Sequence, residues 1–353
     1  MQSRLLRLQD LLQKYKVDAC VIEEPKDLLY FTGIAMSAGR LWVHNKKVAL
    51  FVDGRYREVC IKNSVIQPVF ESKAEVERDF LRDIHVKKAL FDGAATSFSR
   101  AAELKHFLHA SVNGAEAIAI DRFTMPLRMI KGAVEIHDLK QSIRILKKAY
   151  RHLQTTIQTG ISEQALAQEF EVMLRRLGAQ DAAFDPIIAF EKNTAMPHYR
   201  AGRSKLKQGQ MILFDLGVVY EHYHSDMTRV MFHGIPNPRL LRLVFLVKKA
   251  HKAAVALCKP GSTFGQLDTA ARQVFREHNV EEYFVHSLGH GIGLDTHEIP
   301  TIRFQGIHKD MELQSGMVFT IEPGLYIPGV GGARWEDMIL ITDKGHENLT
   351  EGI

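Results

Sequence analysis

Four acidic residues and one histidine lie in apolar segments where ionisable side chains are not expected. Asp215 directly follows the apolar run Met-Ile-Leu-Phe, and Asp226 comes 11 positions later. Glu322 and Glu336 form a second acidic pair with a spacing of 14, and His290 lies between the two pairs with a glycine on each side. A buried carboxylate must be paired or must bind a metal, because an isolated charge is costly in an apolar interior. These five residues are therefore the first candidates for chemistry.

The five candidates have the composition of a metal site. Four carboxylates brought together unaided would repel one another by roughly several kcal/mol in a low-dielectric cleft. Two divalent cations offset this charge, and oxygen ligands with one imidazole suit Mn²⁺, Co²⁺ or Zn²⁺. Two such ions about 3.5–4 Å apart can share a hydroxide and polarise a carbonyl group. The residue types thus predict metal-assisted hydrolysis.

The spacing within each acidic pair predicts a β-hairpin that positions it. A polar bend through His222 and His224 separates the members of the first pair, and these two histidines are expected to lie in the bend. A glycine-rich loop at 329–332 separates the members of the second pair. The two strands of a hairpin would place the carboxylates of each pair side by side.

Two similar pairs of helices precede these hairpins. Apolar residues recur at steps of three and four from 136 to 157, which predicts a long amphipathic helix that ends at Gly160. Ser162 is expected to cap a second helix, and a matching pair is expected at 241–258 and after Thr263, which starts a capping box. We interpret this pattern as an internal duplication with a shared cleft, and coincidence among common helical hairpins is the alternative.

The chain before Pro126 has a different sequence pattern, which predicts alternating short helices and strands. Strands are expected at 19–22, 47–52, 88–91 and 115–120, and helices near 74–83 and 99–109. This alternation predicts an α/β domain over residues 1–125. The remaining domain, 126–353, contains all of the predicted chemistry.

The composition excludes several classes of protein. The 353 residues are 46% hydrophobic and 25% charged, as in a soluble globular protein, which excludes collagen-like, disordered and disulfide-scaffold chains. A net charge of +5 is weak evidence for a nucleic-acid partner, and none is expected. No apolar run approaches the roughly 20 residues that span a membrane. The three scattered cysteines are too few for a disulfide framework, and we expect a cytoplasmic protein without a membrane partner.

Taken together, the motifs resemble those of the pita-bread metallopeptidases, specifically the prolidase (Xaa-Pro dipeptidase) and aminopeptidase P group. The matching segments are Phe214-Asp-Leu-Gly217, Ser225-Asp-Met-Thr-Arg229, His286-Ser-Leu-Gly-His-Gly-Ile-Gly293, His297-Glu298, Thr320-Ile-Glu-Pro-Gly324 and Arg334-Trp-Glu-Asp337, with Asp53-Gly-Arg-Tyr56 and Arg128-Met-Ile-Lys131 nearer the N-terminus. The resemblance covers nearly the whole chain. It implies an α/β N-terminal domain, an α+β pita-bread catalytic domain with an internal pseudo-twofold duplication, and a homodimer.

The resemblance also implies a role for each metal-ligating candidate. Asp215 and Asp226 would bind one metal, and Asp226 and Glu336 would bridge the pair. His290 and Glu322 would complete the second metal. Glu322 would in addition carry a proton between the nucleophilic water and the leaving nitrogen.

Four further residues match the family's substrate-handling positions. His198 matches a histidine near the leaving group, and His297 matches one that stabilises the tetrahedral intermediate. His286 matches a histidine of the proline-side pocket, and Arg334 matches an arginine that positions the last ligand. For the three histidines, a structural role in the core or as a cap is the alternative.

The chain departs from the family pattern in two places. Many prolidases have an arginine soon after the His-Glu-x-Pro segment, thought to hold the free carboxylate of a dipeptide. Here Thr301 and Ile302 follow the proline, so that Arg303 lies two places later than the arginine of the common pattern. The segment 191–194, Glu-Lys-Asn-Thr, also replaces smaller residues. Dipeptidase and aminopeptidase therefore both remain open.

The sequence thus predicts a binuclear enzyme that hydrolyses the bond between an N-terminal residue and proline in short peptides. Mn²⁺ is the expected metal, with Co²⁺ or Zn²⁺ as alternatives. The competing interpretations are a non-catalytic peptide-binding module on the same fold and an enzyme like methionine aminopeptidase. A binding module would not need all five ligands, and a methionine aminopeptidase would not need the N-terminal domain. The same five ligands argue against a metal-free, creatinase-like hydrolase.

Overall fold

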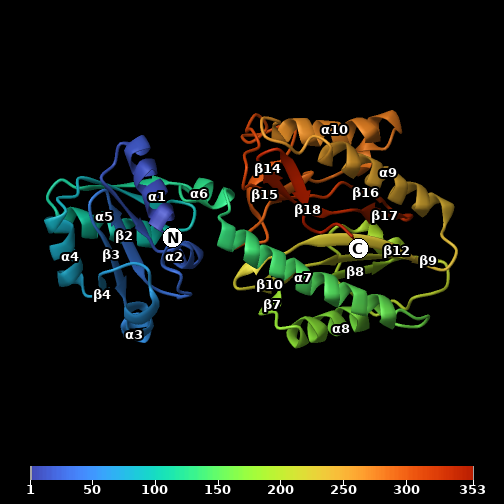
Figure 1. The fold of residues 1–353 in the computed structure, drawn as a ribbon, viewed down its shortest axis with the longest axis horizontal. Coiled ribbons are helices and arrows are strands. Elements are labelled where there is room, and N and C mark those ends of the chain that lie inside the picture. Colours follow the sequence, from blue (N-terminus) through green and yellow to red (C-terminus); the bar gives the residue numbers. More distant parts are fainter. Residues whose placement is uncertain (1, 353) are drawn as a thin grey trace. The chain divides into compact units, whose positions relative to one another are not determined.

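The computed structural model describes residues 2–352 and divides the chain into two compact units (Figure 1). The first unit ends at Leu127 and the second begins at Arg128. Among the described residues, no helix is both long enough and apolar enough to cross a membrane. Each unit has its own buried core and is considered separately below.

The first unit is built around a mixed sheet with the strand order β4-β3-β2-β1-β5-β6. Its elements are α1 (Gln2–Tyr15), β1 (Ala19–Ile22), α2 (Pro25–Thr32), β2 (Arg40–His44), β3 (Val48–Val52), α3 (Gly54–Asn63), β4 (Val69–Glu71), α4 (Ala74–Asp83), β5 (Lys88–Asp92), α5 (Phe98–Ser111), β6 (Glu116–Ile120) and α6 (Met125–Met129), which contains the boundary. β2 runs antiparallel to both neighbours, whereas β1, β5 and β6 are parallel. The predicted α/β architecture is confirmed, although β2 and β4 were not predicted.

The first half of the second unit contains two helices followed by antiparallel strands. These elements are α7 (Ala133–Thr156), α8 (Glu163–Arg176), β7 (Asp181–Ala182), β8 (Ile187–Phe190), the 3₁₀ helix η1 (Glu191–Ala195), β9 (Gln210–Leu216), β10 (Val218–Tyr220), β11 (Tyr223–His224) and β12 (Met227–His233). Both helices pack on the β8–β9–β12 sheet, where Tyr150 and Phe214 meet edge to face at 5.5 Å.

The helix boundaries in this half follow local chemistry. The Ser162 side chain accepts a hydrogen bond from the Ala165 amide at 3.1 Å, so the predicted cap of α8 is confirmed. The predicted end of α7 at Gly160 is wrong. Ile157 already leaves the helical conformation, and Gly160 has a left-handed φ of 91° in the connection to α8.

The second half repeats the order of two helices followed by antiparallel strands. Its elements are α9 (Pro238–Val255), α10 (Phe264–Glu277), the 3₁₀ helix η2 (Glu281–Tyr283), β13 (Gly289–Gly291), β14 (Glu298–Ile302), β15 (Val318–Ile321), β16 (Gly324–Ile327), β17 (Gly331–Arg334), β18 (Asp337–Thr342) and β19 (Gly345–Asn348). Thr263 and Gln266 form the predicted capping box at the start of α10. The sheet order is β14-β13-β15-β18-β19, and β16 pairs with β17.

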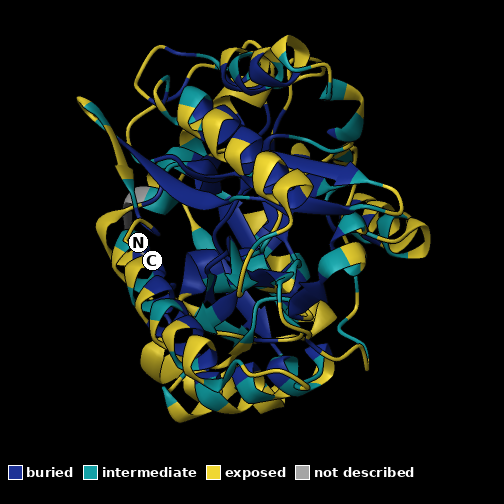
Figure 2. Ribbon diagram, turned by 90° about the vertical axis from the view of Figure 1, so that its right-hand side faces the viewer, coloured by how far each residue is buried: buried dark blue, intermediate teal, exposed yellow. Residues whose placement is uncertain are grey.

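Several strands of the second unit, among them β8, β9 and β15, are buried along nearly their whole length, and Figure 2 shows buried strands in dark blue. β9 and β15 are apolar and buried along most of their length, and each ends at or beside an acidic residue. The helices expose one face and pack the other on these strands. Because these strands are closely packed and shielded from solvent, they can hold ionisable side chains at fixed positions.

Candidate metal centre and active site

The first acidic pair lies where β9 and β12 pair in antiparallel register. Asp215 is opposite Thr228, and Asp226 immediately precedes β12. The chain reverses at Glu221 and His222, whose φ values of 46° and 68° form the tight turn between β10 and β11. The strand pairing therefore brings together the two aspartates that the sequence separates by 11 positions.

The second acidic pair has the same design on β15 and β18. Ile321 is opposite Asp337, so Glu322 and Glu336 continue the paired strands by one residue each. The β16–β17 hairpin fills the interval between them. Each half of the second unit thus contributes two carboxylates, which lie at the ends of paired strands.

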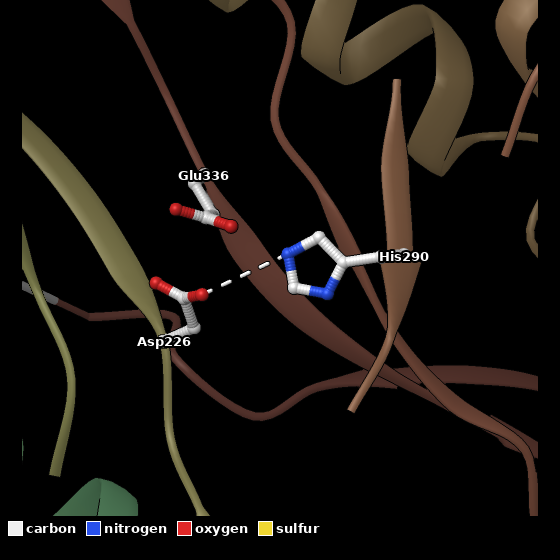
Figure 3. Close-up of side chains that lie close together, drawn as sticks. All are labelled: Asp226, His290 and Glu336. Atoms are coloured by element: carbon white, nitrogen blue, oxygen red, sulfur yellow. Dashed lines mark ion pairs between the residues drawn. The ribbon is translucent and has the colours of Figure 1, made fainter. Parts of the chain in front are cut away.

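The two pairs meet at His290, which β13 carries (Figure 3). Asp226, His290 and Glu336 are buried, and each offers a ligand atom within 4.8 Å of those of the other two. His290 Nε2 lies 3.8 Å from Asp226 Oδ2 and 3.6 Å from Glu322 Oε1. Residues from both halves of the unit thus form a cluster that could hold a metal ion.

Backbone contacts fix the orientation of the His290 ring. Nδ1 lies 3.0 Å from the Gly291 carbonyl, so this nitrogen carries the proton and the Nε2 lone pair faces the carboxylates. A Cβ on Gly289 would lie 2.0 Å from the Thr320 carbonyl oxygen, and one on Gly291 would lie 2.2 Å from that of Ile299. The flanking glycines are therefore required because neighbouring strands approach the backbone too closely for side chains.

The carboxylates carry more negative charge than the surrounding residues neutralise. Within the described part of the chain, Asp215 Oδ1 and Asp226 Oδ1 are buried without a hydrogen-bond partner. Burial and the neighbouring acids raise the pKa of Asp226 and Glu322 well above their usual values. The same causes raise the pKa of Glu336 to about 8. Buried oxygens that lack partners and share excess charge fit divalent cations.

Arg334 and Thr228 connect the two acidic pairs directly. Arg334 donates to Asp215 Oδ2 at 2.5 Å and, through Nε, to Thr228 Oγ1 at 3.0 Å. Thr228 in turn donates to Glu336 Oε2 at 2.8 Å. Sequence reasoning predicted Arg334 but not Thr228, although the residue lies inside a matched segment opposite Asp215.

His286 belongs to a hydrogen-bonded chain that starts at the same arginine. Arg334 donates to the Tyr326 hydroxyl at 2.5 Å, and that hydroxyl lies 2.9 Å from His286 Nε2. Burial, followed by the charge of Arg334, lowers the pKa of His286 to about 3, which keeps the ring neutral. Sequence reasoning missed Tyr326, because no motif marks it and only the β16–β17 hairpin brings it to Arg334.

His297 lies beside His290, on a loop fixed by buried ion pairs. Its ring centroid is 4.3 Å from that of His290. The next residue, Glu298, accepts hydrogen bonds from Arg128 and from Lys131, the latter at 3.2 Å. Burial alone would raise the pKa of Glu298, but these two cations lower it below its usual value. The ionised Glu298 thus anchors the loop that carries His297.

His198 is the remaining predicted histidine, and it is exposed on the connection between η1 and β9. Burial is the main cause that lowers the pKa of His286 and of His297, and the charge of His198 lowers both further. His198 is thus close enough to act electrostatically on both rings. The structure therefore brings the other predicted site residues together, and His198 acts on His286 and His297 through its charge.

The segment that departs from the prolidase pattern also borders the site. Thr301 is exposed on β14 and lies directly opposite His290 in the strand register. Arg303 follows the end of β14, and its charge acts on Asp268 of α10. An uncharged residue therefore occupies the strand position opposite His290.

The metal-free protein should lose thermal stability between about pH 6.5 and pH 8. The pKa of Glu336 is about 8 when folded, above its usual value of 4.5, so deprotonation in this range destabilises the folded state. The lowered pKa values of His286 and His290, about 3 and about 4, act below this range. Thermal melts in chelating buffer check this expectation. Glu336→Gln should weaken the trend, to which the raised pKa values of Asp226 and Glu322 also contribute, and Mn²⁺ should remove it. A constant melting temperature in the parent protein would contradict the electrostatic description.

The sequence matches two known domain families, Metallopeptidase family M24 over residues 137–343 and the Creatinase/Prolidase N-terminal domain over residues 4–130. It is 33% identical to the Xaa-Pro dipeptidase of Pyrococcus furiosus, with coverage of 99% of this chain and 98% of the relative. Among solved structures, the Xaa-Pro dipeptidase from Bacillus anthracis is 30% identical with a TM-score of 0.93, covering 100% of this chain and 98% of that one. The X-Pro aminopeptidase from Thermotoga maritima is 31% identical with a TM-score of 0.87 and covers 96% of both chains. The chain therefore belongs to metallopeptidase family M24: it is a peptidase, and its family implies divalent metal ions.

Proposed function

We propose that this peptidase binds two divalent metal ions and hydrolyses the bond between an N-terminal residue and a following proline. The observation that carries this proposal is the convergence of two strand-end acidic pairs on His290, with buried carboxylate oxygens that lack partners. Relatives over the full chain are named Xaa-Pro dipeptidase and X-Pro aminopeptidase, which supports the same reaction. Mn²⁺ is the proposed metal, because carboxylates dominate the ligand set.

The proposed ligands are Asp215, Asp226, His290, Glu322 and Glu336. When bound, the ions supply Lewis acidity and make water nucleophilic at neutral pH. Asp226 and Glu336 are proposed to bridge the ions, since each belongs to a different acidic pair and both approach His290. Arg334 and Thr228 hold two of the ligands in place through hydrogen bonds.

Glu322 is proposed to transfer the proton that the reaction moves. Burial and the neighbouring Glu336 raise its pKa, which favours the protonated carboxyl group in the metal-free protein. His286 Nδ1 lies 4.0 Å from Glu322 Oε2, so the carboxylate stands between two neutral histidines. A protonated Glu322 can then donate to the leaving nitrogen of proline.

Three histidines are proposed to handle the substrate. His297 donates a hydrogen bond to the developing oxyanion, and His198 acts near the leaving group. The neutral His286 lines the pocket for the proline ring together with Tyr326. Proline lacks an N–H and has a fixed φ, so a dedicated pocket is needed where general peptidases act poorly.

We further propose that the protein is a cytoplasmic homodimer. The three cysteines are free and buried, as suits a reducing compartment. The domain boundary proposed from the sequence, between residues 125 and 126, assigns the whole metal site to the catalytic domain.

The proposed activity is tested with the Mn²⁺-loaded protein on an Xaa-Pro dipeptide, an Xaa-Pro-Xaa peptide and a matched Xaa-Ala peptide. We expect cleavage of proline-containing substrates and little cleavage of the alanine peptide. Preference for the dipeptide would indicate a prolidase, and preference for the longer peptide an aminopeptidase P. Failure to cleave either proline peptide would contradict the proposal and favour a binding module.

His297→Ala should lower kcat by about 10²–10³-fold, the effect of losing one oxyanion donor. The metal content should remain that of the parent protein, because His297 is not a proposed ligand. Steady-state kinetics beside metal analysis of the same preparation separate the two effects. A parallel loss of metal and activity would refute the assigned role.

A further inference from the structure

The segment from 190 to 202, which carries His198, is held by side-chain hydrogen bonds to neighbouring elements. It includes Glu191, Asn193 and Thr194, three of the four residues that depart from the family pattern. The chain here forms η1 and then continues without regular structure to β9. Loops are ordinarily more mobile than helices and strands. The contacts that hold this loop therefore determine how firmly His198 is positioned.

The main anchor is Glu163, a fully buried carboxylate in the first turn of α8. Oε1 accepts hydrogen bonds from the Phe190 amide at 2.7 Å and from Asn193 Nδ2 at 2.8 Å. Oε2 accepts from the Tyr199 hydroxyl at 2.7 Å and from the Gly202 amide at 3.2 Å. One carboxylate therefore gathers four donors from both ends of the 190–202 segment.

The energetics of this contact favour a single loop conformation. A buried carboxylate is costly unless it accepts hydrogen bonds. Any loop conformation that moves the donors away would leave the Glu163 carboxylate buried without hydrogen bonds. The helix N-terminus adds favourable electrostatics for the anion. Burial and the Glu163 contact raise the pKa of Tyr199 to about 12, which keeps its hydroxyl proton available for donation.

Two further contacts attach the segment to the strands that carry the metal site. Glu191 Oε2 accepts a hydrogen bond from the Met211 amide of β9 at 3.0 Å. Thr194 Oγ1 accepts from the Gly332 amide of β17 at 2.8 Å. Glu191 also has a left-handed φ of 47°, a conformation that persists only where surrounding contacts enforce it. The segment is thus fixed to α8, β9 and β17.

We propose that Glu163, acting through Asn193 and Tyr199, is a positioning residue that fixes His198 beside His286 and His297. Tyr199 is the immediate neighbour of His198, so the Glu163–Tyr199 hydrogen bond restrains the backbone that carries the imidazole. Asn193 links the same cluster, because its Nδ2 also lies 3.0 Å from the Tyr199 hydroxyl. This inference rests on the proposed role of His198 near the leaving group.

A double-mutant cycle in the full-length, Mn²⁺-loaded protein tests the inference. Tyr199→Phe removes one hydroxyl and should lower kcat on the Xaa-Pro substrate by about tenfold, the scale of losing a supporting hydrogen bond at an active site. KM and metal content should change less than twofold. In a His198→Ala background, Tyr199→Phe should have no further effect on kcat. Lys192→Ala, an exposed change in the same segment, serves as the matched control and should leave kcat unchanged.

Each result has a separate meaning. If His198→Ala lowers kcat but Tyr199→Phe lowers it equally in both backgrounds, the positioning inference is overturned while the role of His198 stands. If His198→Ala leaves kcat unchanged, both the inference and the proposed role of His198 fail. Asn193→Ala provides a second cycle where Tyr199→Phe folds poorly, and additive effects there would overturn the inference in the same way.

Discussion

The mutual repulsion of buried carboxylates is the constraint on which the second unit depends. Asp226, Glu322 and Glu336 all have raised pKa values, for which burial is the largest cause and neighbouring acids the next. A chain that folds against this repulsion must either protonate the acids or hold cations between them. The duplicated helix–strand arrangement meets this constraint by placing each acidic pair at the end of rigid, paired strands.

The residues around the carboxylates limit their movement. The Arg334 guanidinium contacts Asp215, Thr228 and Tyr326. It therefore holds the Asp215 carboxylate and also orients the Tyr326 hydroxyl, which contacts His286. Two other buried carboxylates each fix a loop that carries a histidine. Glu298, beside His297, accepts a hydrogen bond from Lys131, and Glu163 accepts one from Tyr199, which is beside His198.

Much of this arrangement was predictable from local sequence. The acidic residues in apolar strands and the glycines around His290 identified the cluster, since both patterns are costly without a function. The capping box at Thr263 was equally visible. The end of α7 was predicted wrongly because Gly160 is a common helix terminator, whereas the chain turns earlier to begin the connection to α8. The sequence did not predict the roles of Thr228, Tyr326 and Glu163, because tertiary contacts and not sequence spacing bring these residues to their partners.

The central claim, that two metal ions share the bridging carboxylates, is tested most directly by titrating the metal-free protein with Mn²⁺ in a calorimeter. We expect two ions to bind per chain, and we expect Glu336→Gln to weaken the affinity at both sites, because this carboxylate is proposed to bind both ions. Saturation at one ion per chain, or two unperturbed sites in the variant, would contradict it.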